Sequence, residues 1–267
     1  MTTSDALYAQ GQEVRRRFAG GGTFVSSQPG AQDLAPGLSR IVDEALFGAI
    51  WSRPQLDIRY RSLATISVLT VLQRLPQLKT HVRNGLNLGL SPATITEAMV
   101  HLVFYGGLPA ALNALQIAGE VFAERPEWQR AVQRPQPPRS ATLEERVQLG
   151  NEMRRRLWGQ GEARQGVAAA EELAPDFIRL VDAYLFGEIY YRPHLDLKQR
   201  AVCTLAALTA LGKERQLHRH LRSALRVGLS RQEVVEVLCH TAFYCGLPSA
   251  LNALGVAREV FQEVAAS

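Results

Sequence analysis

Cysteine is scarce in this sequence, and the few cysteines are arranged in a way that excludes several kinds of site. The chain has 3 cysteines, Cys203, Cys239 and Cys245, and no two of them form a C-x-x-C pair. An odd number of cysteines, all in the C-terminal part of the chain, does not form a disulfide framework. The sequence therefore excludes the simplest dithiol redox site and most cysteine-based zinc sites.

Long apolar runs are also missing. No segment reaches the roughly 20 apolar residues that a membrane-spanning helix needs. The N-terminal stretch MTTSDALYAQGQEVRRRF lacks the basic-then-apolar order of a secretory signal peptide. The sequence therefore predicts a cytoplasmic protein that does not interact with a membrane.

The charge balance does not indicate a nucleic-acid partner. The formal net charge is +5 and the isoelectric point is about 9.4, which would permit such binding but does not argue for it. The basic residues are spread along predicted helices and mixed with Asp and Glu. We interpret the runs Arg15-Arg16-Arg17 and Arg154-Arg155-Arg156 as solvated or interface faces of helices.

The chain is an internal duplication. A shift of 139 positions places Leu34-Ala35-Pro36 on Leu173-Ala174-Pro175 and His81 on His220. About half of the positions from Leu34 to Glu124 are identical in this comparison, without a gap. The sequence therefore predicts two copies of one domain, at residues 1–125 and 143–267, joined by a proline-rich linker at 126–142.

The periodicity of each repeat predicts an all-α fold with about six helices and no strands. The apolar fraction of 46% is sufficient for packed cores. Asp57 and Ser91 are predicted helix caps, and Ser230 with Glu233 forms a predicted capping box. The linker segment 134–140 is expected to be semi-extended. The helices expected in the first repeat are 5–18, 35–51, 58–74, 76–88, 91–105 and 109–124.

Three segments, each present twice, resemble the carboxymuconolactone decarboxylase family. They are FGAIWSRPQLDIRYRSLATISVLTVL, HVRNGLNLGLS and FYGGLPAALNAL, with their counterparts in the second repeat. A relative of the same fold, the alkylhydroperoxidase type, uses the motif C-x-x-C-x-x-x-H. Here the two cysteine positions are Arg74 and Gln77 in the first repeat and Lys213 and Gln216 in the second. The resemblance therefore does not extend to the peroxidase.

The resemblance implies a cofactor-independent lyase that binds no metal. The family's type reaction removes carbon dioxide from a carboxylated lactone and then protonates the dienolate that remains. Such a reaction needs a cation for the small anionic substrate, donors for the enolate oxygen and an acid for the proton. Because family members assemble as trimers or hexamers of single domains, we expect a homo-oligomer of this chain, a trimer with six domains.

Arginines and histidines at matching positions are the first candidate site residues. Arginine binds carboxylates through two parallel hydrogen bonds, which makes it suitable for an anionic substrate. Structural salt bridges are the alternative role of these arginines. Histidine titrates near neutral pH and can act as an acid or a base, although a helix-capping or core histidine is the alternative. The candidates are Arg53, Arg61 and His81 in the first repeat and Arg192, Arg200 and His220 in the second.

A second set of candidates lies on the fifth predicted helix of each repeat. Their spacing of four residues places a carboxylate, an imidazole and a phenol on one helix face. The carboxylate can orient the imidazole, and the phenol can donate a proton or hold an oxyanion; a buried polar row between helices is the alternative. The family usually has glutamine at the histidine position. The two sets are Glu97, His101 and Tyr105, and Glu236, His240 and Tyr244.

The two repeats differ at one further candidate position, where Glu188 corresponds to Ala49. We therefore expect the second repeat to hold the better pocket, with His220, Arg192, Arg200 and Glu188 carrying the chemistry. An isomerase, lactone-opening or cyclase reaction and a non-catalytic scaffold are the alternative functions. The paired histidines and tyrosines argue against a scaffold.

Overall fold

The structure is a computed structural model that describes residues 3–22, 34–132 and 142–266. These residues form helices and connecting turns, with no strand among them. The predicted all-α tandem duplication is therefore confirmed. Within the same three ranges, no helix is both long enough and apolar enough to cross a membrane.

The helices of the two repeats follow the same order. The first repeat contains α1 (Ser4–Ala19), α3 (Leu38–Ile41), the π-helix η1 (Val42–Trp51), α4 (Ile58–Val71), α5 (Leu75–Asn87), α6 (Pro92–His101), α7 (Val103–Gly106) and α8 (Leu108–Phe122). The second contains α10 (Leu143–Trp158), α11 (Ala168–Leu173), α12 (Pro175–Val181), the π-helix η2 (Asp182–Phe186), the 3-10 helix η3 (Ile189–Tyr191), α13 (Leu197–Ala210), α14 (Glu214–Arg226), α15 (Arg231–Cys245) and α16 (Leu247–Ala266).

The predicted helix caps are present. The Asp57 carboxylate accepts a hydrogen bond from the main-chain N–H of Arg59 at the start of α4. Ser230 and Glu233 form the predicted capping box of α15, in which each side chain accepts a bond from the other residue's main-chain N–H. These contacts satisfy helix N–H groups that have no partner within the helix, and they therefore fix where the helices begin.

Three predicted segments differ from the structure. The helix expected over 91–105 is divided at Leu102 into α6 and α7. The helix expected over 35–51 is a short α3 followed by the π-helix η1. The second repeat also has a π-helix, η2, at the equivalent position. The predicted linker begins with a short helix, α9 (Pro126–Arg130), because Pro126 starts a helical turn and Trp128 is only 9% exposed. The proline-rich segment 134–140 lies outside the described residues.

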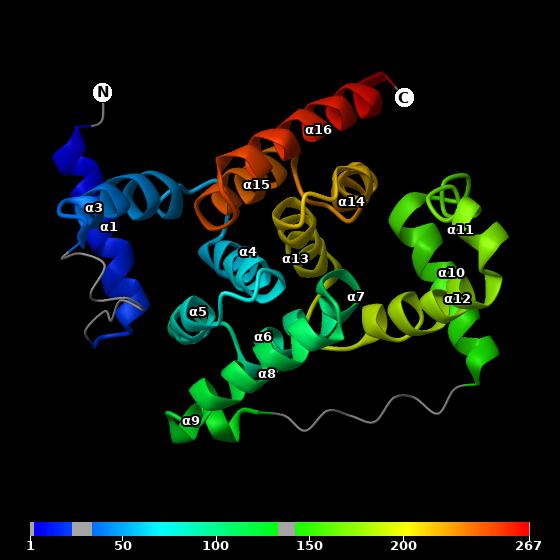
Figure 1. Ribbon diagram of the computed structural model, residues 1–267, viewed down its shortest axis with the longest axis horizontal. Coiled ribbons are helices and arrows are strands. Elements are labelled where there is room, and N and C mark those ends of the chain that lie inside the picture. Colours follow the sequence, from blue (N-terminus) through cyan, green and yellow to red (C-terminus); the bar gives the residue numbers. More distant parts are fainter. Residues whose placement is uncertain (1–2, 23–33, 133–141, 267) are drawn as a thin grey trace.

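The two repeats share one hydrophobic core. Helices α4 and α13 lie side by side at the centre of the molecule (Figure 1). Both are buried on all sides over most of their length, which is why their sequences are apolar without an alternating polar face. Leu63 and Ile66 of α4 belong to the same buried cluster as Val202 and Leu205 of α13.

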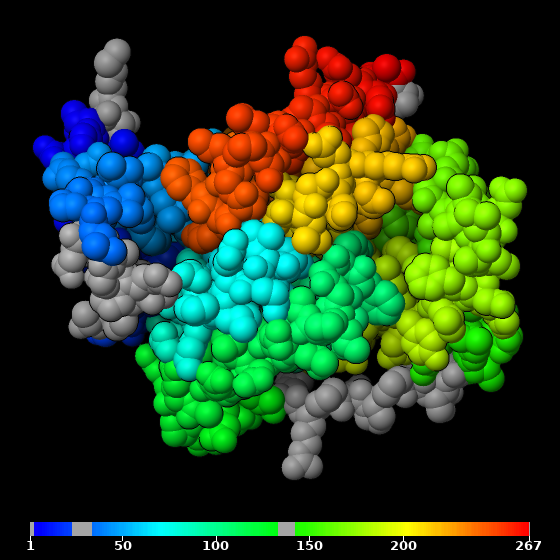
Figure 2. All heavy atoms as spheres, in the orientation of Figure 1, coloured from blue at the N-terminus to red at the C-terminus, as the bar shows by residue number. Residues whose placement is uncertain are grey.

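The N-terminal helices of each repeat form an arm at the end of the molecule. The arm of α1 and η1 lies at one end and the arm of α10, α11, α12 and η2 at the other, with helices of both repeats between them (Figures 1 and 2). Glycines allow α1 to touch η1 in the first arm and α10 to touch η2 in the second. A Cβ atom at Gly11 would overlap the Asp43 carbonyl oxygen, and one at Gly150 would overlap that of Asp182. The arms matter for the site because each leads to an aromatic residue that contacts the other repeat, Trp51 at the end of η1 or Tyr190 in η3.

Replacement of Gly150 by alanine tests this close approach. The added methyl group would push α10 away from η2, so we expect the free energy of unfolding to fall by about 1–3 kcal/mol in urea denaturation. Gly255→Ala is the matched control, because a Cβ there meets no atom within 4 Å. It should leave stability unchanged or raise it by about 0.5–1 kcal/mol. Equal stability of the two variants would contradict the proposed constraint.

Candidate active site

The candidate residues form two sites, and each site combines both repeats. The structure brings the arginines and the histidine of one repeat to the carboxylate, imidazole and phenol of the other. The His81 site contains Trp51, Arg53, Arg61, Thr65 and His81 with Glu236, His240 and Tyr244. The His220 site contains Tyr190, Arg192, Arg200, Thr204 and His220 with Glu97, His101 and Tyr105.

Crossed ion pairs join the repeats at the base of each site. In the His81 site, Glu236 accepts from Arg53 and, at 2.8 Å, from Arg61 Nη2. In the His220 site, Arg192 Nε lies 3.0 Å from both carboxylate oxygens of Glu97. Arg200 Nη2 lies 3.8 Å from the same carboxylate. These arginines therefore make the structural salt bridges that were considered as an alternative, but with the glutamate of the opposite repeat.

Arg61 and Arg200 are completely buried, with 0% of their surface exposed. Burial lowers the pKa of each guanidinium, and the nearby Glu236 or Glu97 opposes this effect. Each also donates to a carbonyl at 2.9 Å, Arg61 to Arg53 and Arg200 to Arg192. These two buried arginines therefore fix the main chain at Arg53 and Arg192, directly after each arm.

A histidine and a threonine form the next layer of each site. His101 Nε2 lies 2.8 Å from Thr204 Oγ1, and His240 Nε2 lies 2.8 Å from Thr65 Oγ1. Both histidines are completely buried, which lowers the pKa of each well below its usual value. Glu97 was considered as the group that orients His101. That interpretation was wrong, because Glu97 binds Arg192 and the imidazole is oriented by Thr204.

A phenol and a second histidine form the part of each site that remains partly accessible. The ring centroids of His220 and Tyr105 are 5.7 Å apart, and those of His81 and Tyr244 are 5.4 Å apart. All four residues are partly buried, whereas His101 and His240 are completely buried.

The electrostatics of this layer keep the histidines neutral and the phenols protonated. Burial lowers the pKa of His81 to about 4. Burial, with the charges of Arg219 and Arg154, lowers the pKa of His220 to about 3. Burial also raises the pKa of both phenols, Tyr105 and Tyr244. At neutral pH each site therefore offers a neutral imidazole as an acceptor and a phenolic O–H as a proton donor.

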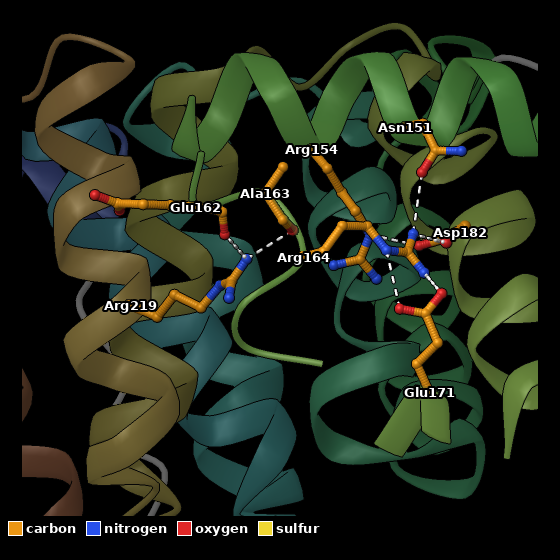
Figure 3. A network of polar contacts seen from close by, with 8 residues as sticks. All are labelled: Asn151, Arg154, Glu162, Ala163, Arg164, Glu171, Asp182 and Arg219. Atoms are coloured by element: carbon orange, nitrogen blue, oxygen red, sulfur yellow. Dashed lines mark hydrogen bonds and ion pairs between the residues drawn. The ribbon is translucent and has the colours of Figure 1, made fainter. Parts of the chain in front are cut away.

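Cations surround the His220 end of its site. Arg154 and Arg164 both donate to Asp182, and Arg164 also binds Glu171 (Figure 3). Arg219, on the neighbouring helix α14, instead donates to the main-chain oxygens of Glu162 at 3.0 Å and Ala163 at 2.9 Å (Figure 3). Carbonyl groups do not neutralise a guanidinium, so the potential at His220 is positive.

An open groove of about 590 Å³ lies at the edge of the His81 site. Trp51 and Arg53 belong to both the groove and the site. Arg17 and Arg59 also line it, with Asp57 as the acidic residue. Arg53 is paired with Glu236 and Arg59 with Asp57, so Arg17 leaves the groove with a small positive charge.

Some candidates lie apart from these contacts. Glu188 lies on the arm, where its Oε2 is 3.8 Å from Arg146 Nε, and its charge also acts on Arg192. The neighbouring His218 is two residues before His220 on α14 and therefore lies on a different helix face, where its Nε2 is 2.9 Å from Glu263 Oε1. In the part of the chain that the structure describes, no three His, Cys, Asp or Glu side chains converge in a way that would hold a metal ion.

Several site residues were not singled out from the sequence. Thr65 and Thr204 occupy equivalent positions, so their identity in both repeats was a usable signal. The aromatic residues Trp51 and Tyr190 also occupy equivalent positions, but they differ in type. Their hydrogen bonds to Tyr244 and Tyr105 cross between repeats, and no pattern within one repeat indicates such a contact.

Comparison with known proteins matches both repeats to one family. The Carboxymuconolactone decarboxylase family matches residues 36–120 and 175–259, which include every residue of the two sites. A 4-carboxymuconolactone decarboxylase of Acinetobacter baylyi is 31% identical over 121 residues, covering 45% of this chain and 90% of the relative. An uncharacterized 15.0 kDa protein of Paracoccus denitrificans is 35% identical over 123 residues, covering 45% and 91%. A nitrosuccinic acid decarboxylase of Metarhizium robertsii is 30% identical over 125 residues, covering 43% and 87%.

Replacement of Glu97 by glutamine tests the crossed ion pairs. The change removes the negative charge beside Arg200, which has 0% exposure and cannot recover its hydration. We expect the free energy of unfolding to fall by about 3–5 kcal/mol in urea denaturation. Glu13→Gln is the matched control, because its pair with Arg16 is exposed on α1, and it should cost less than about 1 kcal/mol. A similar small loss in both variants would show that the crossed pairs do not hold the repeats together.

Proposed function

Because this chain belongs to the carboxymuconolactone decarboxylase family, we propose that it is an enzyme that removes carbon dioxide from a small organic acid. The observation that carries the proposal is the pair of a neutral histidine and a protonated tyrosine, with their rings in contact, in each site. Two relatives named as decarboxylases of different acids support the reaction type rather than one substrate.

The proposed substrate is a carboxylated lactone or a related keto acid. In such molecules the electrons left by the departing carbon dioxide move onto a carbonyl oxygen and form an enolate. The arginine-lined groove beside Trp51 and the positive potential around His220 both support an anionic substrate. Arg53 and Arg192 are the partly exposed arginines of the two sites, with 42% and 21% of their side chains exposed, so they are the cations that a substrate carboxylate can reach.

We assign the proton transfer to the phenols. When the bond to the carboxylate breaks, carbon dioxide leaves and the enolate takes the bonding electrons. Tyr105 in the His220 site, or Tyr244 in the His81 site, then transfers its proton to the enolate carbon. The phenolate regains a proton from water, so the reaction consumes one proton for each carbon dioxide released.

The histidines have separate tasks in this proposal. His220 and His81 are neutral, so they accept or donate a hydrogen bond at the substrate without a net charge. His101 and His240, which stand where the family usually has glutamine, hold the threonine beside each phenol. These steps use side chains alone, and we propose that neither a metal nor an organic cofactor takes part.

We also propose that the chain assembles with copies of itself as a trimer with six repeats. Each repeat exposes the same apolar residues at the start of its last long helix, between 41% and 63% of their surface. They are Phe104, Leu108 and Leu112 in the first repeat and Phe243, Leu247 and Leu251 in the second. Apolar side chains clustered in this way are typical of an interface.

Light scattering tests the assembly. We expect a mass of about three times the 29.5 kDa of one chain. The double variant Leu108→Asp, Leu247→Asp should dissociate without unfolding, because both side chains are exposed in the single chain. Val132→Asp, at an exposed residue outside these clusters, is the control and should leave the mass unchanged. A wild-type mass of one chain would contradict the proposal.

Release of carbon dioxide from 4-carboxymuconolactone by the purified, chelator-treated protein tests the activity. If the His220 site carries most of the turnover, His220→Ala should lower kcat/KM by about 100-fold or more. The matched control is His218→Ala, which removes a histidine of the same helix that binds Glu263 instead. Full turnover in His220→Ala would exclude the assigned role. Isomerisation of the substrate without carbon dioxide release would favour the isomerase alternative.

A further inference from the structure

The two sites differ at the residue that the arm places beside the phenol. In the His81 site, Trp51 Nε1 donates to the hydroxyl oxygen of Tyr244 at 2.8 Å. In the His220 site the equivalent residue is Tyr190, and its hydroxyl lies 3.1 Å from that of Tyr105. The two aromatic rings occupy matching positions with 2% and 7% of their surface exposed, so the difference is chemical rather than positional.

An indole and a phenol do not offer the same hydrogen bonds. The indole N–H of Trp51 can only donate, and it is already committed to Tyr244. The hydroxyl of Tyr190 both donates and accepts, and it rotates about its C–O bond. When a negatively charged oxygen enters the His220 site, Tyr105 and Tyr190 can therefore both turn their protons towards it.

The geometry allows both phenols to bind one oxygen atom. Two hydroxyl oxygens 3.1 Å apart can each lie about 2.7 Å from a third oxygen. Two donors on one oxyanion stabilise an enolate. Tyr105 holds the enolate oxygen in this way until its proton passes to the enolate carbon, and Tyr190 remains as the donor to that oxygen. The His81 site can supply only the single hydroxyl of Tyr244 in this way, because its second group is the indole.

The charges around the two sites reinforce the difference. Arg154 and Arg219 act on His220, and Arg154 also acts on Tyr105. The residue equivalent to Arg219 in the first repeat is Thr80, which carries no charge. A negative oxygen is therefore favoured at the His220 site both by an additional donor and by an additional cation.

We infer that Tyr190 is a second oxyanion donor, which acts with Tyr105, and that it makes the His220 site the stronger binder of an enolate. This inference deepens the proposed function and rests on it for the identity of the enolate. The His81 site, with Trp51 in the same position, then binds neutral carbonyl groups or turns over more slowly.

A phenolate probe tests the inference without the proposed reaction. The phenolate form of 4-nitrophenol is coloured and carries a delocalised negative oxygen, so absorbance titration measures how tightly each site binds it. In the wild-type chain we expect one tighter and one weaker class of site. Tyr190→Phe keeps the ring and removes only the hydroxyl, and it should weaken the tighter class about ten- to one-hundredfold.

Two further variants keep the result independent of folding. Tyr191→Phe removes the neighbouring hydroxyl, which is on an exposed side chain and donates to the Leu149 carbonyl, and it should leave both classes unchanged. Trp51→Tyr introduces a second phenol into the His81 site and should create a second tight class. This gain of binding cannot arise from partial unfolding.

The outcomes separate this inference from the proposed function. Wild-type affinity in Tyr190→Phe, or no binding of the phenolate form by the wild type, would overturn the role of Tyr190. Phenolate binding that depends on Tyr190 in a protein that releases no carbon dioxide would support the donor pair and reject the decarboxylation. Carbon dioxide release with equal turnover in wild type and Tyr190→Phe would support decarboxylation and reject the donor pair.

Discussion

The fold depends on two buried arginines whose counter-charges come from the opposite repeat. Arg61 and Arg200 are inaccessible to solvent, and an isolated buried cation is too costly to persist in a folded protein. Glu236 and Glu97 supply the charges, and each comes from a helix more than 90 residues away in the chain. Neither repeat can therefore complete its centre alone. The same requirement holds the repeats together where α4 and α13 share one core.

The same crossed pairing places the chemistry between the repeats. In the first repeat α6 carries Glu97 and His101 and the short α7 carries Tyr105, whereas α15 carries all three equivalent residues of the second repeat. The three side chains are four residues apart, so a glutamate fixed by an arginine also helps to fix the phenol. The arginine and the histidine of the other repeat then face this row. As a result, an ion pair that holds the fold together also sets the distance between Tyr105 and His220, whose rings are 5.7 Å apart.

The helices and the residue types of the site could be predicted from the sequence, but the way they meet could not. Asp57, Ser91 and Ser230 are local signals, because a cap acts within one turn of its own helix. The spacing of Glu97, His101 and Tyr105 predicted a common face for the same reason. Their partners lie in the other repeat, and a contact between residues 95 positions apart leaves no trace in helical periodicity. The close approach of Gly11 to Asp43 and of Gly150 to Asp182 is likewise a tertiary contact, and helical periodicity does not predict it.

Fusion of the two repeats into one chain allows the two sites to diverge. When two identical chains pair around a twofold axis, a substitution at one position alters both sites equally. In this chain positions 51 and 190 are encoded separately, and they hold an indole and a phenol at the same place in the fold. The residues of the ion pairs cannot change so freely, because loss of either glutamate would leave a buried arginine without a counter-charge. The energetics of the duplicated fold therefore require Arg61, Arg200, Glu97 and Glu236 to stay the same in both repeats, and they allow positions 51 and 190 to differ.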